Sequence, residues 1–173
     1  VYLMGEASFK VAHDKKHPFI VKTNDMQVTA LGTEFNVSAY PDDRKVESTL
    51  IEGSVKVDCN DMHNSVILKP GQMMAYNRDT HKYEVMTPNI ADITAWQRGE
   101  VVFKEKTLAQ IFSTLERKYP YSFHYSMHRI SNDRYTLHFP DNAPIKDVMD
   151  VIVRVTGKHA YRIEGDNCYF YNK

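Results

Sequence analysis

The protein has 173 residues, with 22 Lys and Arg against 22 Asp and Glu, and 42% of its residues are hydrophobic. This composition is typical of a folded globular protein and excludes a disordered or fibrous chain. Because the balanced charge provides no basic surface to gather phosphates, we expect no nucleic-acid partner. No run approaches the roughly 20 apolar residues that cross a bilayer, and the first residues lack the pattern of a secretion signal.

The first half of the chain predicts an all-β domain. Up to about residue 90, short runs of alternating apolar and polar residues are separated by frequent turn signals. Pairs such as Val28 and Ala30, or Val55 and Val57, therefore share one face of a pleated strand. Val1 already belongs to an apolar stretch with no turn before it, so we expect the sequence to begin inside a strand.

In the second half the apolar period changes to that of helices. One apolar stripe covers residues 108–119, and Thr107 is placed to cap the exposed amides before it. A second stripe covers residues 145–152, with Pro144 at its start and Gly157 after its end. Two amphipathic helices are therefore predicted.

Strands flank both helices, at residues 100–104, 121–126, 134–139, 159–164 and 168–173. The two apolar stripes match at an offset of 37 residues, which indicates a strand-helix-strand unit used twice. Because neither helix can bury its stripe alone, we expect both to pack on one shared small sheet. The predicted fold class is therefore mixed, with an all-β domain at residues 1–97 and a small α+β domain at residues 98–173.

Three further residues are predicted to be buried. Trp96 lies at the predicted junction and has a large apolar body, so we expect it to be buried there. Cys59 and Cys168 fall in different predicted domains and lack metal-site spacing, so we expect separate core or edge thiols.

The histidines do not predict a metal site. His13 and His17, and likewise His124 and His128, are spaced four apart, but both pairs fall at strand or turn positions. Such spacing joins two rings only on a helix. The motifs of common hydrolases and nucleotide-binding enzymes are also missing. We therefore expect no metal, no cofactor and no conventional enzyme.

Aromatic residues crowd the last predicted strand. Alternation places Tyr169 and Tyr171 on one face and Phe170 on the other, so one face is available to a partner. Exposed aromatics on strands also stack sugars, which leaves a carbohydrate-binding or sugar-processing β-domain as an alternative function. A partner strand can also add to an exposed edge, for which strands 134–139 and 168–173 are the candidates. The predicted partner-binding residues are Arg134, Tyr135, Leu137, Tyr169 and Tyr171.

Several longer strings are more specific. They are GEASFKVA at 5–12, PFIVKT at 18–23, LGTEFNVSAY at 31–40, TLIEGSVKV at 49–57 and LKPGQMMAY at 68–76, followed by Trp96. In this order the chain resembles the periplasmic region of FecR-type anti-sigma regulators, with Gly5, Gly53, Pro70, Gly71 and Trp96 as structural positions of the motif. Residues 98–173 are similar to the C-terminal domain common in the Bacteroidetes branch of that family. That domain itself resembles the secretin and TonB-receptor N-terminal (STN) fold.

The resemblance implies a single-pass inner-membrane regulator. Its cytoplasmic segment would hold an extracytoplasmic-function sigma factor, and its periplasmic part would respond to a TonB-dependent outer-membrane transporter. We expect only the periplasmic part here, with the membrane helix and the sigma-binding segment upstream. The implied partner of this chain is the transporter's signalling domain, which has the STN fold, so we expect contact through residues 98–173.

The resemblance also singles out Gly32 and Thr33. Several FecR-type regulators cut themselves at the Gly-Thr bond of the LGT-x-FNV string, which is intact here. A Thr hydroxyl can attack the preceding carbonyl and form an ester that water opens, provided that the fold strains the amide and supplies a base. The sequence marks no neighbouring residue as that base. The alternative is a structural bulge or tight turn between strands 26–31 and 34–40.

Overall fold

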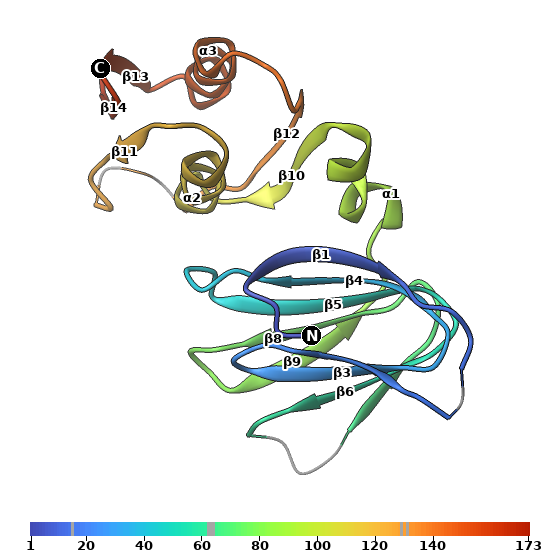
Figure 1. The fold of residues 1–173 in the computed structure, drawn as a ribbon. Coiled ribbons are helices and arrows are strands. Elements are labelled where there is room, and N and C mark those ends of the chain that lie inside the picture. The colour runs from blue at the N-terminus through green and yellow to red at the C-terminus, as the bar shows by residue number, and fades with distance from the viewer. Residues whose placement is uncertain (15, 62–64, 129, 131) are drawn as a thin grey trace. The chain divides into compact units, whose positions relative to one another are not determined.

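The computed structural model describes residues 1–14, 16–61, 65–128, 130 and 132–173. The chain forms two compact units, Val1–Thr94 and Ala95–Lys173 (Figure 1). Their boundary lies close to the change of apolar period in the sequence. Among the described residues, no helix has both the length and the apolar content needed to cross a membrane.

The first unit is a sandwich of two antiparallel sheets. Its strands are β1 (Gly5–Lys10), β2 (Phe19–Lys22), β3 (Met26–Ala30), β4 (Glu34–Ala39), β5 (Lys45–Glu52), β6 (Val55–Cys59), β7 (Val66–Leu68), β8 (Met73–Asn77) and β9 (Lys82–Met86), followed by the short helix α1 (Ile90–Ile93). One sheet has the order β1-β4-β5-β8-β9 and the other the order β2-β3-β6-β7. Tyr2 additionally forms a parallel bridge with Lys22 of β2.

The two sheets share one core, as the alternating sequence predicts. Buried side chains of both sheets form a single cluster that includes Val28 of β3, Val57 of β6 and Phe35 of β4. Polar residues between them on the strands stay nearer to solvent, which confirms the period of two. At the edge of the cluster the ring of Phe9 in β1 lies 5.2 Å from that of Phe35.

The chain alternates between the two sheets after every hairpin. Three passages from one sheet to the other contain a glycine with positive φ, at Gly32 (102°), Gly53 (91°) and Gly71 (83°). The strand registers place these glycines at one end of the sandwich, because Ala30 pairs with Val55 and the strand ends around them coincide. The turns within each sheet therefore lie at the opposite end.

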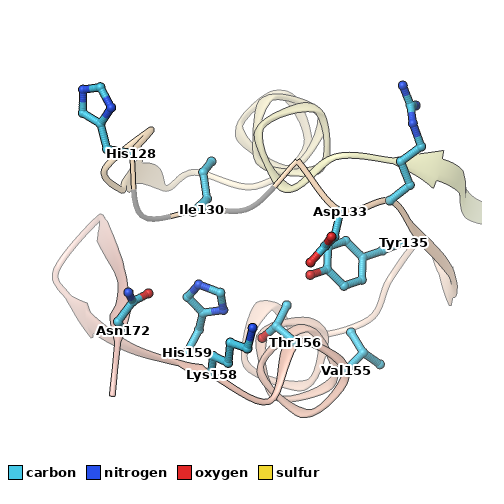
Figure 2. A pocket seen from close by; sticks show the side chains of 10 residues that line it. His128, Ile130, Asp133, Tyr135, Val155, Thr156, Lys158, His159 and Asn172 are labelled. Carbon is cyan, nitrogen blue, oxygen red and sulfur yellow. The ribbon is translucent and has the colours of Figure 1, made fainter.

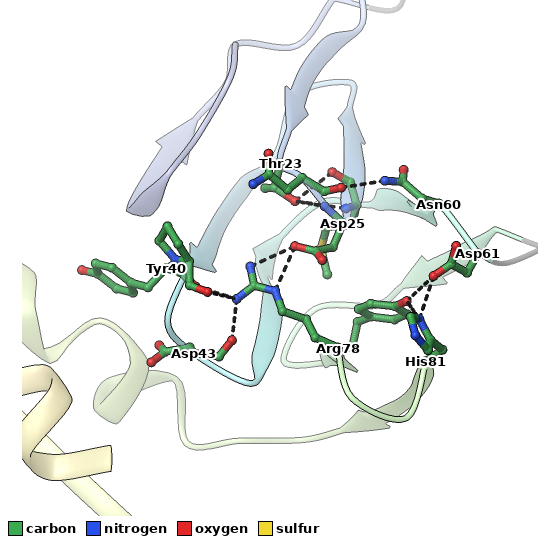
Figure 3. Close-up of polar contacts among 12 residues, drawn as sticks. Thr23, Asp25, Tyr40, Asp43, Asn60, Asp61, Arg78 and His81 are labelled. Atoms are coloured by element: carbon green, nitrogen blue, oxygen red, sulfur yellow. Dashed lines mark hydrogen bonds and ion pairs between the residues drawn. The ribbon is translucent and has the colours of Figure 1, made fainter. Parts of the chain in front are cut away.

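Charged side chains hold the hairpin end together (Figure 3). The guanidinium of Arg78, just after β8, donates from Nε and Nη2 to Oδ2 of Asp25 at 3.1 and 2.9 Å. Its Nη1 donates to the carbonyl oxygens of Tyr40, at 2.7 Å, and of Asp43. Asp25 belongs to the four-stranded sheet's first turn, so this side chain connects both sheets. Arg78 and Asp25 are only 19% and 20% exposed.

A second polar group lies at the same end (Figure 3). The Tyr76 hydroxyl and His81 Nδ1 both contact Oδ2 of Asp61, each at 2.8 Å. The hydrogen bond from Tyr76 and that from His81 keep the pKa of Asp61 below its ordinary value. Burial, together with the negative Asp61, raises the pKa of Tyr76 to about 12. The carboxylate form is thus favoured and the tyrosine remains a donor.

We expect Arg78→Lys to lower the free energy of unfolding by about 2–4 kcal/mol. A lysine ammonium cannot reproduce the planar fork that reaches one carboxylate and several carbonyls at once. The matched control is Arg44→Lys, since Arg44 pairs with Asp79 at 3.6 Å on the exposed surface and should change stability by less than about 0.5 kcal/mol. Urea unfolding measures both, and equal losses in the two variants would contradict the role given to Arg78.

The second unit contains two helices and five strands among its described residues. They are β10 (Glu100–Lys106), α2 (Leu108–Lys118), β11 (Ser122–His124), β12 (Tyr135–Pro140), α3 (Ile145–Thr156), β13 (His159–Glu164) and β14 (Asn167–Asn172), preceded by the 3-10 turn η1 (Ala95–Arg98). All five predicted strands are present. The largest differences in their bounds are a longer β10 and a shorter β11.

Both helices begin and end as their sequences predict, and both bury their predicted apolar stripes. Thr107 caps α2 in a reciprocal capping box with Gln110. Helix α3 starts after Pro144 and ends at Gly157, which has a φ of 68° and donates its N–H to the Val153 carbonyl at 3.0 Å. The buried residues are Leu108, Ile111, Phe112 and Leu115 in α2, and Ile145, Val148, Met149 and Ile152 in α3.

The prediction of one shared sheet was wrong. Strands β10 and β12 form a two-stranded antiparallel sheet, whereas β11, β14 and β13 form a separate three-stranded sheet. Each strand-helix-strand unit therefore contributes one strand to each sheet. The helices still share one core, in which the ring of Phe112 lies 5.2 Å from Phe123 and 5.0 Å from Phe170. Apolar spacing identifies such strands but does not reveal which distant strand each one pairs with.

The burial of Trp96 was also predicted wrongly. The side chain is 45% exposed, while the adjacent Ala95 in the same 3-10 turn is buried. A single turn presents only one face inward, and Ala95 takes that face. The loss of about 3–5 kcal/mol that truncation of a fully buried tryptophan causes is therefore not expected for Trp96→Ala. The two cysteines are free and buried, and burial raises the pKa of each thiol to about 11.

Candidate functional site

The strand edges of the second unit differ from those predicted. The terminal strand β14 is the centre of its sheet, between β11 and β13, so the prediction that it offers a free edge was wrong. The parallel pairing with β11 causes this, since Ser122 lies opposite Asn167 and His124 opposite Tyr169. In the described part of the unit, β12 pairs only with β10 and β13 only with β14, so each has one open edge.

The exposed face of the three-stranded sheet carries a row of stacked side chains. The ring of Tyr169 lies 4.9 Å from the ring of His124 and 4.9 Å from the guanidinium carbon of Arg162. His124 lies on β11, Tyr169 on β14 and Arg162 on β13. The strand registers place both His124 and Arg162 opposite Tyr169. Tyr171 is 42% exposed, whereas Phe170 between them is buried, as alternation predicts.

The sequence did not single out His124 and Arg162 as members of this row. In the sequence, the spacing of His124 from His128 suggests only a possible metal pair, and Arg162 is one of many charged residues. The signal would have been the pairing of β11 with β14, which brings residue 124 beside residue 169. The His124 ring is also held by Asn167, whose Oδ1 lies 2.8 Å from Nε2.

The other three predicted partner residues, Arg134, Tyr135 and Leu137, lie in or directly before β12, which belongs to the two-stranded sheet and not to the sheet that carries this row. Leu137 is a core residue and cannot contact a partner, so that part of the prediction was wrong. Arg134 donates from Nη1 to the Glu105 carbonyl at 2.8 Å. Glu105 has a positive φ of 52° at a register shift in β10, so Arg134 stabilises this irregular backbone.

Tyr135 lines a cavity of about 630 Å³ beside the end of α3 (Figure 2). The wall opposite is formed by Val155 and Thr156 of α3 and by Lys158, His159 and Asn172 from the strands that follow. Arg134 and Asp133 complete the side next to β12. The lining of this cavity therefore combines the positive charges of Arg134 and Lys158 with the carboxylate of Asp133.

The Gly32–Thr33 peptide lies at the crossover end of the first unit. Gly32 has a φ of 102°, a region that residues with a Cβ rarely adopt. Thr33 is 5% exposed, and its Oγ1 has no hydrogen-bond partner among the residues that the structure describes. The Thr33 carbonyl accepts the Val11 N–H at 2.9 Å, which holds β1 beside it. A buried hydroxyl without a partner is uncommon, because burial removes its hydrogen bonds to water.

His13 is the residue at this site that sequence analysis missed. A Cβ added to Gly32 would lie 2.7 Å from His13 Nδ1 and 2.5 Å from its Cα, so the imidazole packs directly against the glycine. Nineteen positions separate these two residues in the sequence. Only the path of the chain between β1 and β2 brings them together.

The remaining glycines of the motif have different surroundings. A Cβ on Gly53 would lie 2.7 Å from Thr33 Cγ2 and 2.9 Å from the Gly32 carbonyl oxygen, whereas a Cβ on Gly71 would meet nothing within 4 Å. Gly71 follows the exposed Pro70 in a turn, and its N–H donates to the Leu50 carbonyl at 2.9 Å. Gly5 has a φ of 115° and lies against the Tyr40 ring.

We expect Gly53→Ala to lower the free energy of unfolding by about 2–4 kcal/mol, because it adds a steric clash to a strained backbone. Gly71→Ala is the matched control, since it has a similar φ and open space, and should cost only about 1 kcal/mol. Thermal or urea unfolding of both variants isolates the contact with Thr33. Equal losses would show that conformation alone, rather than close approach, requires glycine at this position.

No group of three or more His, Cys, Asp or Glu side chains that could hold a metal ion occurs among the residues whose placement is described. The candidate sites described above are the stacked row of His124, Tyr169 and Arg162, the cavity beside β12 and the Gly32–Thr33 peptide. The first two could bind a partner, and the third contains a peptide bond with an unusual conformation.

Comparison with known proteins covers nearly the whole chain. The FecR protein family model matches residues 2–56, and the FecR C-terminal family model matches residues 100–170. Two crystal structures of a protein from Parabacteroides distasonis ATCC 8503, proposed to be an anti-sigma factor, are 27% identical and cover 99% of this chain and 79% of theirs. Their TM-scores are 0.89 and 0.88. None of the curated proteins compared with the chain matches it. The chain belongs to the FecR family of anti-sigma factors, which are regulators.

Proposed function

We propose that this chain is the periplasmic sensing and signal-transducing part of an inner-membrane anti-sigma regulator. It relays the state of a TonB-dependent outer-membrane transporter to an extracytoplasmic-function sigma factor. The chain's own partner is the transporter's signalling domain, and sigma-factor binding belongs to a cytoplasmic segment of the whole protein. The observation that carries this proposal is the exposed row formed by His124, Tyr169 and Arg162.

This row has the properties of a recognition surface. Aromatic and arginine side chains dominate the energetics of protein interfaces, and here they are stacked and so lose little freedom on binding. The opposite face of the same sheet is core, where Cys168 and Phe170 are buried. Next to the row, the open edge of β13 can accept a partner strand, a mode available to a domain of similar, STN-like fold.

We expect Tyr171→Ala to weaken binding of the signalling domain of the partner transporter about tenfold or more. Titration calorimetry of this domain with the whole chain measures the affinity. Tyr83→Ala is the matched control, because Tyr83 lies on β9 of the first unit and is 46% exposed against 42% for Tyr171. Equal affinities of the two variants would place the contact elsewhere. Binding to glycans, with no transporter domain bound, would instead favour the alternative of a carbohydrate-binding β-domain.

We also propose that the chain cuts itself once at the Gly32–Thr33 bond. Oγ1 of Thr33 attacks the Gly32 carbonyl carbon, the C–N bond breaks, and the hydroxyl proton ends on the freed amine. Water then hydrolyses the resulting ester, leaving a Gly32 carboxylate and restoring the Thr33 hydroxyl. The buried Thr33 hydroxyl, which has no hydrogen-bond partner among the described residues, supports this step. We propose His13 as the group that carries the proton, because its imidazole packs against Gly32.

Intact mass under denaturing conditions tests this proposal on the full-length protein. We expect fragments ending at Gly32 and starting at Thr33, abolished by Thr33→Ala and kept by Thr33→Ser. His13→Asn should slow their appearance about tenfold or more, since general acid-base groups contribute at least that much. The control is His17→Asn, because His17 is exposed and contacts Asp14 instead. An uncut chain after long incubation would leave Gly32–Thr33 as a structural crossover only.

A further inference from the structure

The first unit contains a pocket beside the Gly32–Thr33 peptide, and the functions proposed above assign no ligand to it. It has a volume of about 650 Å³ and lies at the crossover end. The lining residues that matter here are His13, Thr29, Leu31, Thr33, Lys56 and Ile67. This volume is in the range of pockets that enclose small molecules, about 300–1,000 Å³.

The floor of the pocket is the outer face of the four-stranded sheet. Thr29 of β3 pairs with Lys56 of β6, which in turn pairs with Ile67 of β7, so the three lie in one row across the sheet. Val28 and Val57, their neighbours along the strands, point into the core. Two of the three strands that carry these residues, β3 and β6, are therefore fixed by the packing of their other face in the core.

Two large apolar side chains border this floor without protein cover. Ile67 is 67% exposed and Leu31 is 43% exposed, and both line the pocket. Leu31 follows β3 directly, in the passage that contains Gly32, while Ile67 lies on the edge strand β7. Apolar side chains gathered around a concavity on a soluble domain are typical of a ligand site.

The charges of the lining indicate the kind of ligand. His13 and Lys56 are the ionisable side chains in the described lining, and no carboxylate accompanies them there. The ion pair of Lys56 with Asp58, at 3.2 Å, lies on the partly exposed surface, so it competes only weakly for the ammonium. A ligand with an apolar body and one negative group could pack against the apolar side chains of the lining and form an ion pair with Lys56.

We propose that this pocket binds a small amphipathic carboxylate. Its apolar body lies between Leu31 and Ile67, and its carboxylate points toward Lys56 and His13. The Gly32–Thr33 peptide is in the same lining, so a bound ligand would lie against that bond. The proposal does not depend on transporter binding or on self-cleavage.

Titration calorimetry of the whole chain with octanoate tests the proposal, with 1-octanol as the uncharged probe of equal chain length. We expect octanoate to bind about tenfold more tightly than 1-octanol, and Lys56→Met to remove that preference. Ile67→Ser should weaken octanoate about tenfold through lost apolar contact. Val85→Ser is the matched control, since Val85 is an exposed aliphatic residue on β9, an edge strand of the five-stranded sheet, and its replacement should leave binding unchanged.

Each other outcome would overturn the proposal. Equal affinity for octanoate and 1-octanol would remove the role of Lys56 and His13. Equal loss in Ile67→Ser and Val85→Ser would indicate unspecific adsorption to exposed apolar edges. Absence of octanoate binding by the unaltered chain at millimolar concentration would exclude the site, whatever the transporter and cleavage experiments show.

Discussion

The fold of the first unit depends on how its chain passes between two sheets. Each hairpin is completed within one sheet, and the chain then crosses to the other sheet at the same end of the sandwich. Gly32 and Gly53 lie in two of these crossings, and the two crossings contact each other. A Cβ on Gly53 would overlap Thr33 and the Gly32 carbonyl oxygen. Only a residue without a side chain fits both the close approach and the positive φ.

This arrangement gives the two ends of the sandwich different properties. The hairpin end is polar and is fixed by the fork of Arg78 on Asp25 and on backbone carbonyls. At the crossover end the buried Thr33 hydroxyl has no hydrogen-bond partner among the described residues, and a pocket lined by both apolar and positively ionisable side chains lies beside it. The glycine with positive φ, the nearby imidazole and the pocket all follow from this topology, and they lie at the end where we propose self-cleavage and ligand binding.

The surface of the second unit that we propose for recognition arises from the pairing of distant strands. The two strand-helix-strand units exchange strands, so that β10 pairs with β12 and β11 with β14. The helices fill the shared core and leave the far face of the three-stranded sheet to solvent. On that face the pairing brings His124, Tyr169 and Arg162 into one stack, although they lie on three separate segments. This stack therefore forms only in the complete unit.

The secondary structure could be predicted from the sequence because periodicity and caps are local properties, and the family could be predicted from strings such as LGTEFNVSAY. The helical stripes, the Thr107 cap, the Gly157 end and the alternation around Phe170 follow from residues a few positions apart. The strand order could not be predicted in this way, and it made β14 a central strand, while tertiary packing buried Leu137 and left Trp96 exposed. It also brought His13 to Gly32 and Leu31 to Ile67. Such contacts join residues far apart in the chain, and they depend on register and packing, which no local pattern encodes.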